Sequence, residues 1–141
     1  MIHGSCACKG ARFELDDTID FINHCHCSIC RKTSGAEFGT FAHARASGFR
    51  YSQGEELVVY YASSPAARRA FCRVCGSCMP VVYAEQNHVV IPAGTLDDDP
   101  GVRPSVHIFT GSKAPWVEIA DALTKYEAWP PGVAPPERAS S

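Results

Sequence analysis

The chain of 141 residues is long enough for one domain with a real core, and its 45% hydrophobic and 20% charged residues are ordinary for a globular protein. A net charge of −2 gives no reason to expect a nucleic-acid partner, and no stretch approaches the roughly 20 apolar residues of a membrane span. Because the first residues lack a positive segment followed by an apolar run, we expect no secretory signal and a cytoplasmic protein.

Eight cysteines are many for an intracellular chain of this length. Their close spacing favours metal ligands over disulfides in a reducing compartment. The first two, Cys6 and Cys8, lie in a stretch bracketed by Gly4 and Gly10, and we expect these glycines to supply the backbone angles that a tight ligand loop needs.

Short apolar or alternating runs follow along the chain. The spacing predicts strands at intervals of roughly 8 to 12 residues, over 11–15, 19–23, 38–42, 48–51, 57–61, 68–71, 79–83, 88–91 and 106–109. The segment 27–34 lacks strand character, and we expect a helical turn there that ends at Gly35. This succession favours an antiparallel β architecture.

The segment from Trp116 to Tyr126 allows two interpretations. Its apolar residues follow helical spacing, and Pro115 fits the first position of a helix. Because the segment is short and its periodicity is mixed, we do not expect an extended helix. Residues 131–141 are rich in Pro, Ala and Ser and are predicted to form a C-terminal tail, which leaves 1–130 as a single domain.

Two distant cysteine pairs predict one closed metal site. Cys72 and Cys75 have the spacing of a zinc knuckle, and Cys6 and Cys8 can present both sulfurs to one ion. Four thiolates make a structural zinc site, and closing a loop of roughly 60 residues would strongly constrain the unfolded chain. The alternative is a set of buried thiols or a redox pair.

The densest cluster holds Cys25, Cys27 and Cys30 within six residues. Three protein ligands with an open fourth position are typical of a catalytic zinc site, where water or a substrate thiolate completes the shell. The spacing equally allows a closed site, whose fourth ligand would be His24, His26 or Cys78.

Other polar residues favour structural roles. We interpret His43, His88 and His107 as packed, hydrogen-bonded histidines, and the aspartates 97–99 as a solvated turn that lacks the spacing of a calcium loop. Arg68, Arg69 and Arg73 could receive substrate carboxylates, but a solvated strand edge is the favoured interpretation.

Taken in order, five motifs resemble those of the glutathione-dependent formaldehyde-activating enzyme family, which includes centromere protein V. They are the segments 4–10 (GSCACKG), 25–32 (CHCSICRK), 71–77 (FCRVCGS), 94–98 (GTLDD) and 107–117, which runs from HIFT to PWV. Together these motifs span the chain to about residue 130, and their combination is specific where any one alone would be weak. Cys78 is a departure from the family pattern.

The resemblance implies a mainly β fold of several small twisted antiparallel sheets around zinc-binding cysteine clusters, with short helical turns only. It implies two zinc ions, a structural one on Cys6, Cys8, Cys72 and Cys75 and an exchangeable catalytic one on Cys25, Cys27 and Cys30. The family's activity is the formation of S-hydroxymethylglutathione from glutathione and formaldehyde, a carbon–sulfur lyase reaction in reverse.

The first hypothesis is therefore a zinc-dependent lyase in which a zinc-bound thiolate, such as that of glutathione, adds to a small aldehyde such as formaldehyde. His24 or His26 would assist proton transfer. The second hypothesis is a non-catalytic binding module stabilised by zinc, and the third is a thiol redox switch. The sequence does not give the true substrates or the oligomeric state.

Overall fold

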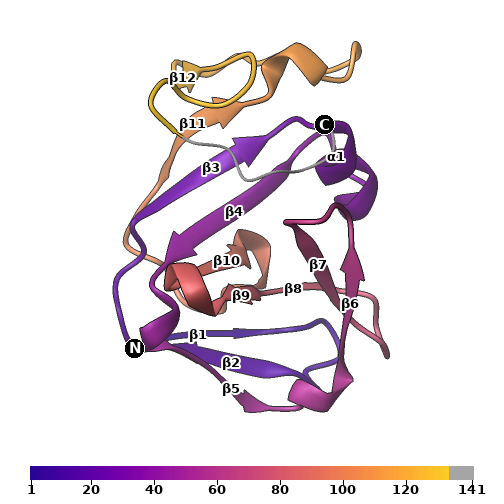
Figure 1. The fold of residues 1–141 in the computed structure, drawn as a ribbon, viewed down its shortest axis with the longest axis vertical. Helices are drawn as coiled ribbons and strands as arrows, with labels where there is room; N and C mark the ends of the chain where they lie inside the picture. Colours follow the sequence, from indigo (N-terminus) through magenta and orange to yellow (C-terminus); the bar gives the residue numbers. More distant parts are fainter. Residues whose placement is uncertain (134–141) are drawn as a thin grey trace.

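The computed structural model describes residues 1–133, and their strands form three sheets around a shared core (Figure 1). The tail expected at 131–141 is therefore described only to Val133, and residues 134–141 lie outside the described part. Between residues 1 and 133, no helix is both long and apolar enough to cross a membrane.

The largest sheet has six strands in the order β12–β11–β3–β4–β10–β9. Its strands are β3 (Phe21–Cys25), β4 (Gly39–Ala44), β9 (Val81–Tyr83), β10 (His88–Pro92), β11 (Pro104–Ile108) and β12 (Thr124–Lys125). Strands β3, β4, β10 and β9 pair antiparallel, but β11 pairs in parallel with both β3 and β12. The sheet is thus mixed, and its two parallel pairings are a detail that the expected, mainly antiparallel architecture did not include.

Two three-stranded antiparallel sheets complete the fold. One is β1–β2–β5, made of β1 (Ile2–Ser5), β2 (Arg12–Leu15) and β5 (Phe49–Gln53). The other is β6–β7–β8, made of β6 (Val58–Ala62), β7 (Arg68–Cys72) and β8 (Cys78–Met79). All three sheets contribute buried side chains to one core, among them Phe13, Met79 and Ile91. A mainly β fold built from small sheets is thereby confirmed.

Helical structure is short throughout the described residues. The single α-helix is α1 (Ser28–Ser34), and the 3-10 turns are η1 (Ala46–Gly48), η2 (Glu55–Leu57), η3 (Ala84–Gln86), η4 (Ala93–Thr95) and η5 (Thr110–Ser112). Helix α1 ends at Gly35, which adopts the left-handed conformation (φ 66°) and donates its N–H to the carbonyl of Arg31. The helical turn and its glycine stop are confirmed.

The first strand, β1, was missed because its sequence, Ile2–Ser5, had been read only as the approach to a ligand loop. The role expected for the flanking glycines was also wrong. The left-handed residue of this loop is Lys9 (φ 62°), and a Cβ on Gly4 would lie 2.0 Å from the ring of Phe13. Glycine is needed at position 4 for close packing rather than for its backbone angles.

The segment from Trp116 to Tyr126 forms no helix, as expected. Its one regular element is β12, which adds a parallel edge to the large sheet. Just beyond it, Trp129, Pro130 and Val133 line a pocket described below. The domain boundary predicted at residue 130 stays a prediction.

Candidate metal centres

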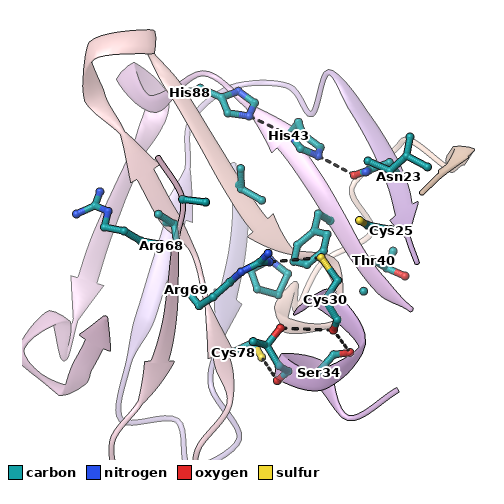
Figure 2. A pocket seen from close by; sticks show the side chains of 18 of the residues that line it. Asn23, Cys25, Cys30, Ser34, Thr40, His43, Arg68, Arg69, Cys78 and His88 are labelled. Carbon is teal, nitrogen blue, oxygen red and sulfur yellow. Dashed lines mark hydrogen bonds between the residues drawn. The ribbon is translucent and has the colours of Figure 1, made fainter. Parts of the chain in front are cut away.

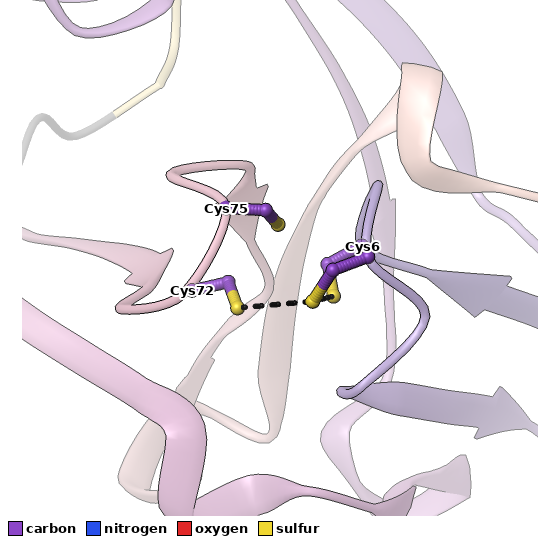
Figure 3. Close-up of side chains that lie close together, drawn as sticks. Cys6, Cys72 and Cys75 are labelled. Carbon is purple, nitrogen blue, oxygen red and sulfur yellow. Dashed lines mark hydrogen bonds between the residues drawn. The ribbon is translucent and has the colours of Figure 1, made fainter.

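The fold brings the two distant cysteine pairs together. The sulfur atoms of Cys6, Cys8, Cys72 and Cys75, hereafter the four-cysteine cluster, all lie within 4.8 Å of one another. Figure 3 shows Cys6 approaching from the loop after β1 and Cys72 and Cys75 from the turn after β7. The cluster therefore joins the sheet β1–β2–β5 to the sheet β6–β7–β8.

A tight turn presents Cys72 and Cys75 to the cluster. The N–H of Gly76, in the left-handed conformation (φ 75°), donates to the carbonyl of Cys72 at 2.8 Å, and the N–H of Cys72 donates to the carbonyl of Ser77 at 2.9 Å. Hydrogen bonds from Ser77 lower the pKa of the Cys75 thiol to about 5. This turn has the backbone of a zinc knuckle and favours a thiolate at its tip.

The sulfur separations fit a tetrahedral metal site. Zinc–sulfur bonds of about 2.3 Å in a tetrahedron place sulfur atoms about 3.8 Å apart. The Sγ atoms of Cys6 and Cys8 are 3.5 Å apart, and those of Cys8 and Cys72 are 3.9 Å apart. Four free thiols converge without a disulfide, which is the donor set of a closed zinc site.

A second group of sulfurs comes from consecutive short elements. Cys25 ends β3, Cys27 is the N-cap of α1, and Cys30 lies in its first turn. These sulfurs, hereafter the three-cysteine cluster, also lie within 4.8 Å of one another. The N–H of Cys30 donates to the Sγ of Cys27 at 3.2 Å, so the helix N-terminus orients one sulfur.

Burial favours the protonated form of the thiols in this second cluster. All three cysteines are at most 5% exposed. Contacts with Cys27 and Cys30, together with burial, raise the pKa of the Cys25 thiol far above its usual range. The hydrogen bond between Cys30 and Cys25 would by itself lower the pKa of Cys30. Contact with Cys27 and burial outweigh it, so the pKa of Cys30 is also raised. As thiolates, these buried sulfurs would require positive charge nearby, which a metal ion could supply.

The three-cysteine cluster opens onto a pocket of about 910 Å³ (Figure 2). Cys25 and Cys30 line this pocket, whereas Cys27 lies behind them and is fully buried. The wall around them is largely apolar, with Phe41, Ile108 and Trp129 among its residues. An ion held here would have access to a small molecule, which the closed four-cysteine cluster does not offer.

Arg69 lies at the site, although the sequence favoured a solvated strand edge over a substrate-binding role for it. The solvated strand edge predicted for it is wrong, because its Nη1 donates to the Sγ of Cys30 at 3.4 Å from the pocket wall. Burial would by itself lower the pKa of Arg69. The charge interaction and the hydrogen bond with Cys30 outweigh burial, so the pKa of Arg69 is raised. A fixed positive charge thus lies beside the cluster. The contact spans 39 positions of sequence, and no local pattern signals it.

Cys78 also lines the pocket, but its sulfur is not within 4.8 Å of all three sulfurs of the cluster. The Cys78 thiol instead donates to the carbonyl of Thr33 at 3.5 Å (Figure 2). The geometry therefore favours a cluster of three ligands over one that Cys78 closes.

His24 and His26 do not reach the pocket. Strand β3 alternates, so that Phe21, Asn23 and Cys25 line the pocket while His24 faces the opposite side and contacts the hydroxyl of Thr40 at 2.8 Å. The proton-transfer role expected for these two histidines finds no support in this arrangement.

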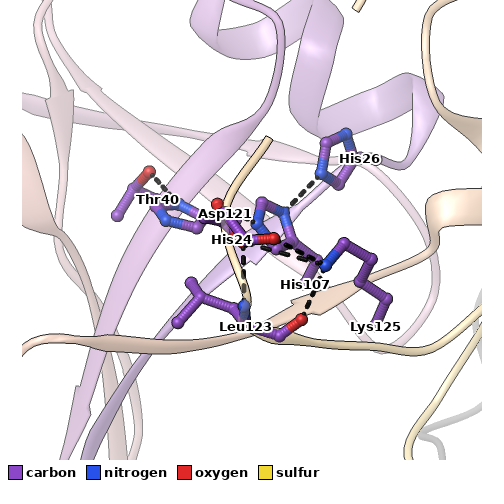
Figure 4. Close-up of polar contacts among 7 residues, drawn as sticks. All are labelled: His24, His26, Thr40, His107, Asp121, Leu123 and Lys125. Atoms are coloured by element: carbon purple, nitrogen blue, oxygen red, sulfur yellow. Dashed lines mark hydrogen bonds and ion pairs between the residues drawn. The ribbon is translucent and has the colours of Figure 1, made fainter. Parts of the chain in front are cut away.

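Beyond the strand, His26 belongs to a buried histidine chain (Figure 4). His26 Nε2 contacts His107 Nδ1 at 2.8 Å, and His107 Nε2 contacts the carboxylate of Asp121 at 2.9 Å. His107 is the packed, hydrogen-bonded histidine that its sequence context predicted. Asp121 comes from the segment before β12. The hydrogen bonds of His26, His107 and Asp121 therefore hold that segment close to the three-cysteine cluster.

A second polar chain lies in the pocket wall itself. His88 Nε2 contacts His43 Nδ1 at 3.0 Å, and His43 Nε2 contacts Asn23 Oδ1 at 2.7 Å (Figure 2). The histidines are packed and hydrogen-bonded, as expected, but no sequence pattern indicates that they line a pocket or that Asn23 joins them.

Comparison with known proteins gives consistent results. A family model described as glutathione-dependent formaldehyde-activating enzyme matches residues 1–112, which include both cysteine clusters. A Halomonas elongata protein, provisionally named a glutathione-dependent formaldehyde-activating enzyme, is 33% identical over 130 residues, covering 84% of this chain and 81% of the relative. A Schizosaccharomyces pombe protein, named an uncharacterized lyase, is 31% identical over 80 residues, covering 57% of this chain and 56% of its own.

Solved structures also match the fold of the chain. A crystal structure of a Rhodobacter sphaeroides protein superposes with a TM-score of 0.54, at 24% sequence identity, covering 72% of this chain and 97% of that one. The likeness supports the fold of the chain.

Proposed function

Since the chain belongs to the glutathione-dependent formaldehyde-activating enzyme family, we propose that it adds a small thiol such as glutathione to a small aldehyde such as formaldehyde. The reaction is that of a carbon–sulfur lyase in reverse, and its product is a hemithioacetal. The observation that carries the proposal is the position of the three-cysteine cluster in the wall of an apolar pocket. Among residues 1–133, no fourth cysteine sulfur lies within 4.8 Å of all three.

We further propose that both clusters hold zinc. Cys6, Cys8, Cys72 and Cys75 would hold a structural ion, and Cys25, Cys27 and Cys30 an exchangeable one. Sulfur donors at tetrahedral separations support zinc at the first cluster, and three buried thiols that need a cation support it at the second. Zinc bound there would lower the pKa of a substrate thiol and hold its sulfur beside the aldehyde.

The residues of the chain itself would contribute in three ways. Cys25, Cys27 and Cys30 leave one side of their cluster facing the pocket, so that a substrate sulfur approaches from there. The guanidinium of Arg69 offsets negative charge that gathers on Cys30 and on an incoming sulfur. The apolar wall keeps water from the reacting groups and thereby strengthens these interactions.

Partners follow from this chemistry: a small thiol and a small aldehyde, with neither nucleic acid nor membrane required. The cytoplasmic location expected from the sequence stays a prediction.

The direct test measures S-hydroxymethylglutathione formation above the spontaneous rate. We expect the zinc-loaded wild type to accelerate the reaction and Cys27→Ser to lose at least about 100-fold of that acceleration. Cys78→Ser is the matched control, because it removes a thiol from the same pocket wall without touching the cluster. Equal rates in wild type and Cys27→Ser would contradict the proposal and favour the non-catalytic binding module.

A further inference from the structure

We infer that the side-chain amide of Asn23 binds the aldehyde oxygen and stabilises the negative charge that this oxygen gains as the carbon–sulfur bond forms. The inference rests on the proposed thiol addition and adds a catalytic residue to it. It is carried by the place of Asn23 in the pocket, by the fixed orientation of its amide and by its unused N–H groups.

Asn23 and Cys25 lie on the same face of β3, and both line the pocket. Residues two apart in a strand are about 7 Å apart along its axis. A substrate sulfur at tetrahedral spacing from the cluster sulfurs, the carbon and oxygen of an aldehyde, and a hydrogen bond to that oxygen together bridge a distance of this order. The amide is thus near the point where the aldehyde oxygen would lie.

The orientation of the amide is fixed by two histidines. A carbonyl oxygen can only accept, so the 2.7 Å contact of Asn23 Oδ1 requires a proton on His43 Nε2. Burial and the neighbouring His88 lower the pKa of His43 to about 3, so His43 is neutral and its Nδ1 accepts from His88 Nε2. With Oδ1 placed on His43, the hydrogen bonds run from His88 through His43 to Asn23, and the amide nitrogen is turned away from His43.

The amide nitrogen has no hydrogen-bond partner among residues 1–133. Asn23 is only 5% exposed, yet its Nδ2 is not among the fully buried unpaired atoms, so its remaining exposure is toward the pocket that it lines. An almost buried donor without a partner is costly unless a ligand uses it. The neighbouring hydroxyl groups are already engaged, since Thr40 contacts His24 and Ser34 donates to the carbonyl of Cys30.

The chemistry requires a donor at this place. The sulfur lone pair forms the carbon–sulfur bond while the π electrons of the carbonyl move to its oxygen. The proton of the thiol has already passed to water, and the oxygen takes a proton from water to become the hydroxyl of the product. Asn23 donates a hydrogen bond to this oxygen throughout and transfers no proton. Removing one such donor from an oxyanion site typically lowers kcat by about 100- to 1,000-fold.

The test compares Asn23→Leu, which keeps the side-chain volume but removes the amide, with Gln86→Leu, which removes an exposed amide from the rim of the same pocket. Rates above the spontaneous reaction are measured with glutathione and formaldehyde. Zinc content and thermal midpoint are measured on each variant. Thiol affinity is measured from the absorption of protein with cobalt(II) in the three-cysteine cluster.

We expect Asn23→Leu to lose about 100-fold in kcat with zinc content and thiol affinity unchanged, and Gln86→Leu to match the wild type. The thermal midpoint of Asn23→Leu should fall slightly, because His43 Nε2 loses its acceptor. His43→Phe, which frees the amide to rotate, should lose about tenfold, and His43→Gln, which can still donate to Asn23 Oδ1, should restore most of it. A kcat within threefold of wild type in Asn23→Leu would overturn the inference, as would a loss that tracks lost zinc or thiol binding. A wild type without acceleration would overturn the proposed function itself.

Discussion

The four-cysteine cluster joins distant segments, since Cys8 and Cys72 are 64 positions apart in the sequence. The three-cysteine cluster lies within six consecutive residues. The first forms only when two sheets have come together. The second needs one strand end and the first turn of α1. We therefore expect metal binding at the four-cysteine cluster to be coupled to folding of the whole chain, and metal at the three-cysteine cluster to exchange with the fold intact.

One would expect a structural site to be more buried than a catalytic one, but the two clusters show the reverse. Cys8 of the four-cysteine cluster is exposed, whereas every member of the three-cysteine cluster is buried. The difference lies in ligand number and in the pocket beside Cys25 and Cys30. A buried ion with one side toward a pocket can select a small molecule and exclude bulk water.

The largest effect should come from breaking the four-cysteine cluster. Cys72→Ser removes a fully buried ligand, and structural zinc supplies about 10–16 kcal/mol of binding free energy in zinc-finger peptides, more than a domain of this size has to spare. We expect no cooperative thermal unfolding by circular dichroism and less than one zinc per chain. A thermal midpoint within a few degrees of wild type would abolish the distinction between the two clusters.

The next effect separates two roles of Cys27. Serine caps helix N-termini well, so Cys27→Ser should lose the metal but keep the cap on α1, whereas Cys27→Ala loses both. Both variants should lose activity by at least about 100-fold. The free energy of unfolding of Cys27→Ala should be about 1 kcal/mol lower than that of Cys27→Ser. Denaturant titration of the two proteins measures this difference. Global unfolding of Cys27→Ser would show that the three-cysteine cluster, too, is structural.

A smaller effect is expected at Arg69. Arg69→Met keeps an apolar stem but removes the charge beside Cys30, so an incoming thiolate is bound less well. We expect KM for the thiol to rise about tenfold, with partial recovery in Arg69→Lys. Steady-state kinetics with varied thiol decide the matter. An unchanged KM in Arg69→Met would mean that the guanidinium serves packing alone.

The smallest effect should follow from Cys78→Ser. Its thiol contacts a backbone carbonyl rather than the three-cysteine cluster, and a serine hydroxyl can make the same contact. Activity and zinc content should change by less than about twofold. Loss of the second zinc ion in this variant would identify Cys78 as a fourth ligand.

Local patterns predicted much of the molecule. Close spacing within each cysteine pair or triplet limits where the sulfurs can point, so the grouping of Cys72 with Cys75, and of Cys25 with Cys27 and Cys30, could be predicted. The stop at Gly35 was also predictable, because glycine readily adopts left-handed backbone angles.

Features that depend on distant contacts could not be predicted in this way. The parallel pairing of β11 with β3 joins residues far apart in the chain, such as His24 and His107, and local periodicity does not indicate which strands pair. Arg69 resembled a solvated residue because a run of arginines carries no information about a sulfur 39 positions away. Asn23 reaches its role through His43 and His88, which lie on two other strands.

The central claim is that the three-cysteine cluster holds its ion with one position left for a substrate thiol. Its most direct test places cobalt(II) in this cluster, keeps zinc in the four-cysteine cluster, and follows the sulfur-to-cobalt charge-transfer band while glutathione is added. We predict a band that rises with glutathione and saturates, equally in wild type and Cys78→Ser. A band that already has the intensity of four thiolates and does not respond to glutathione would contradict the claim.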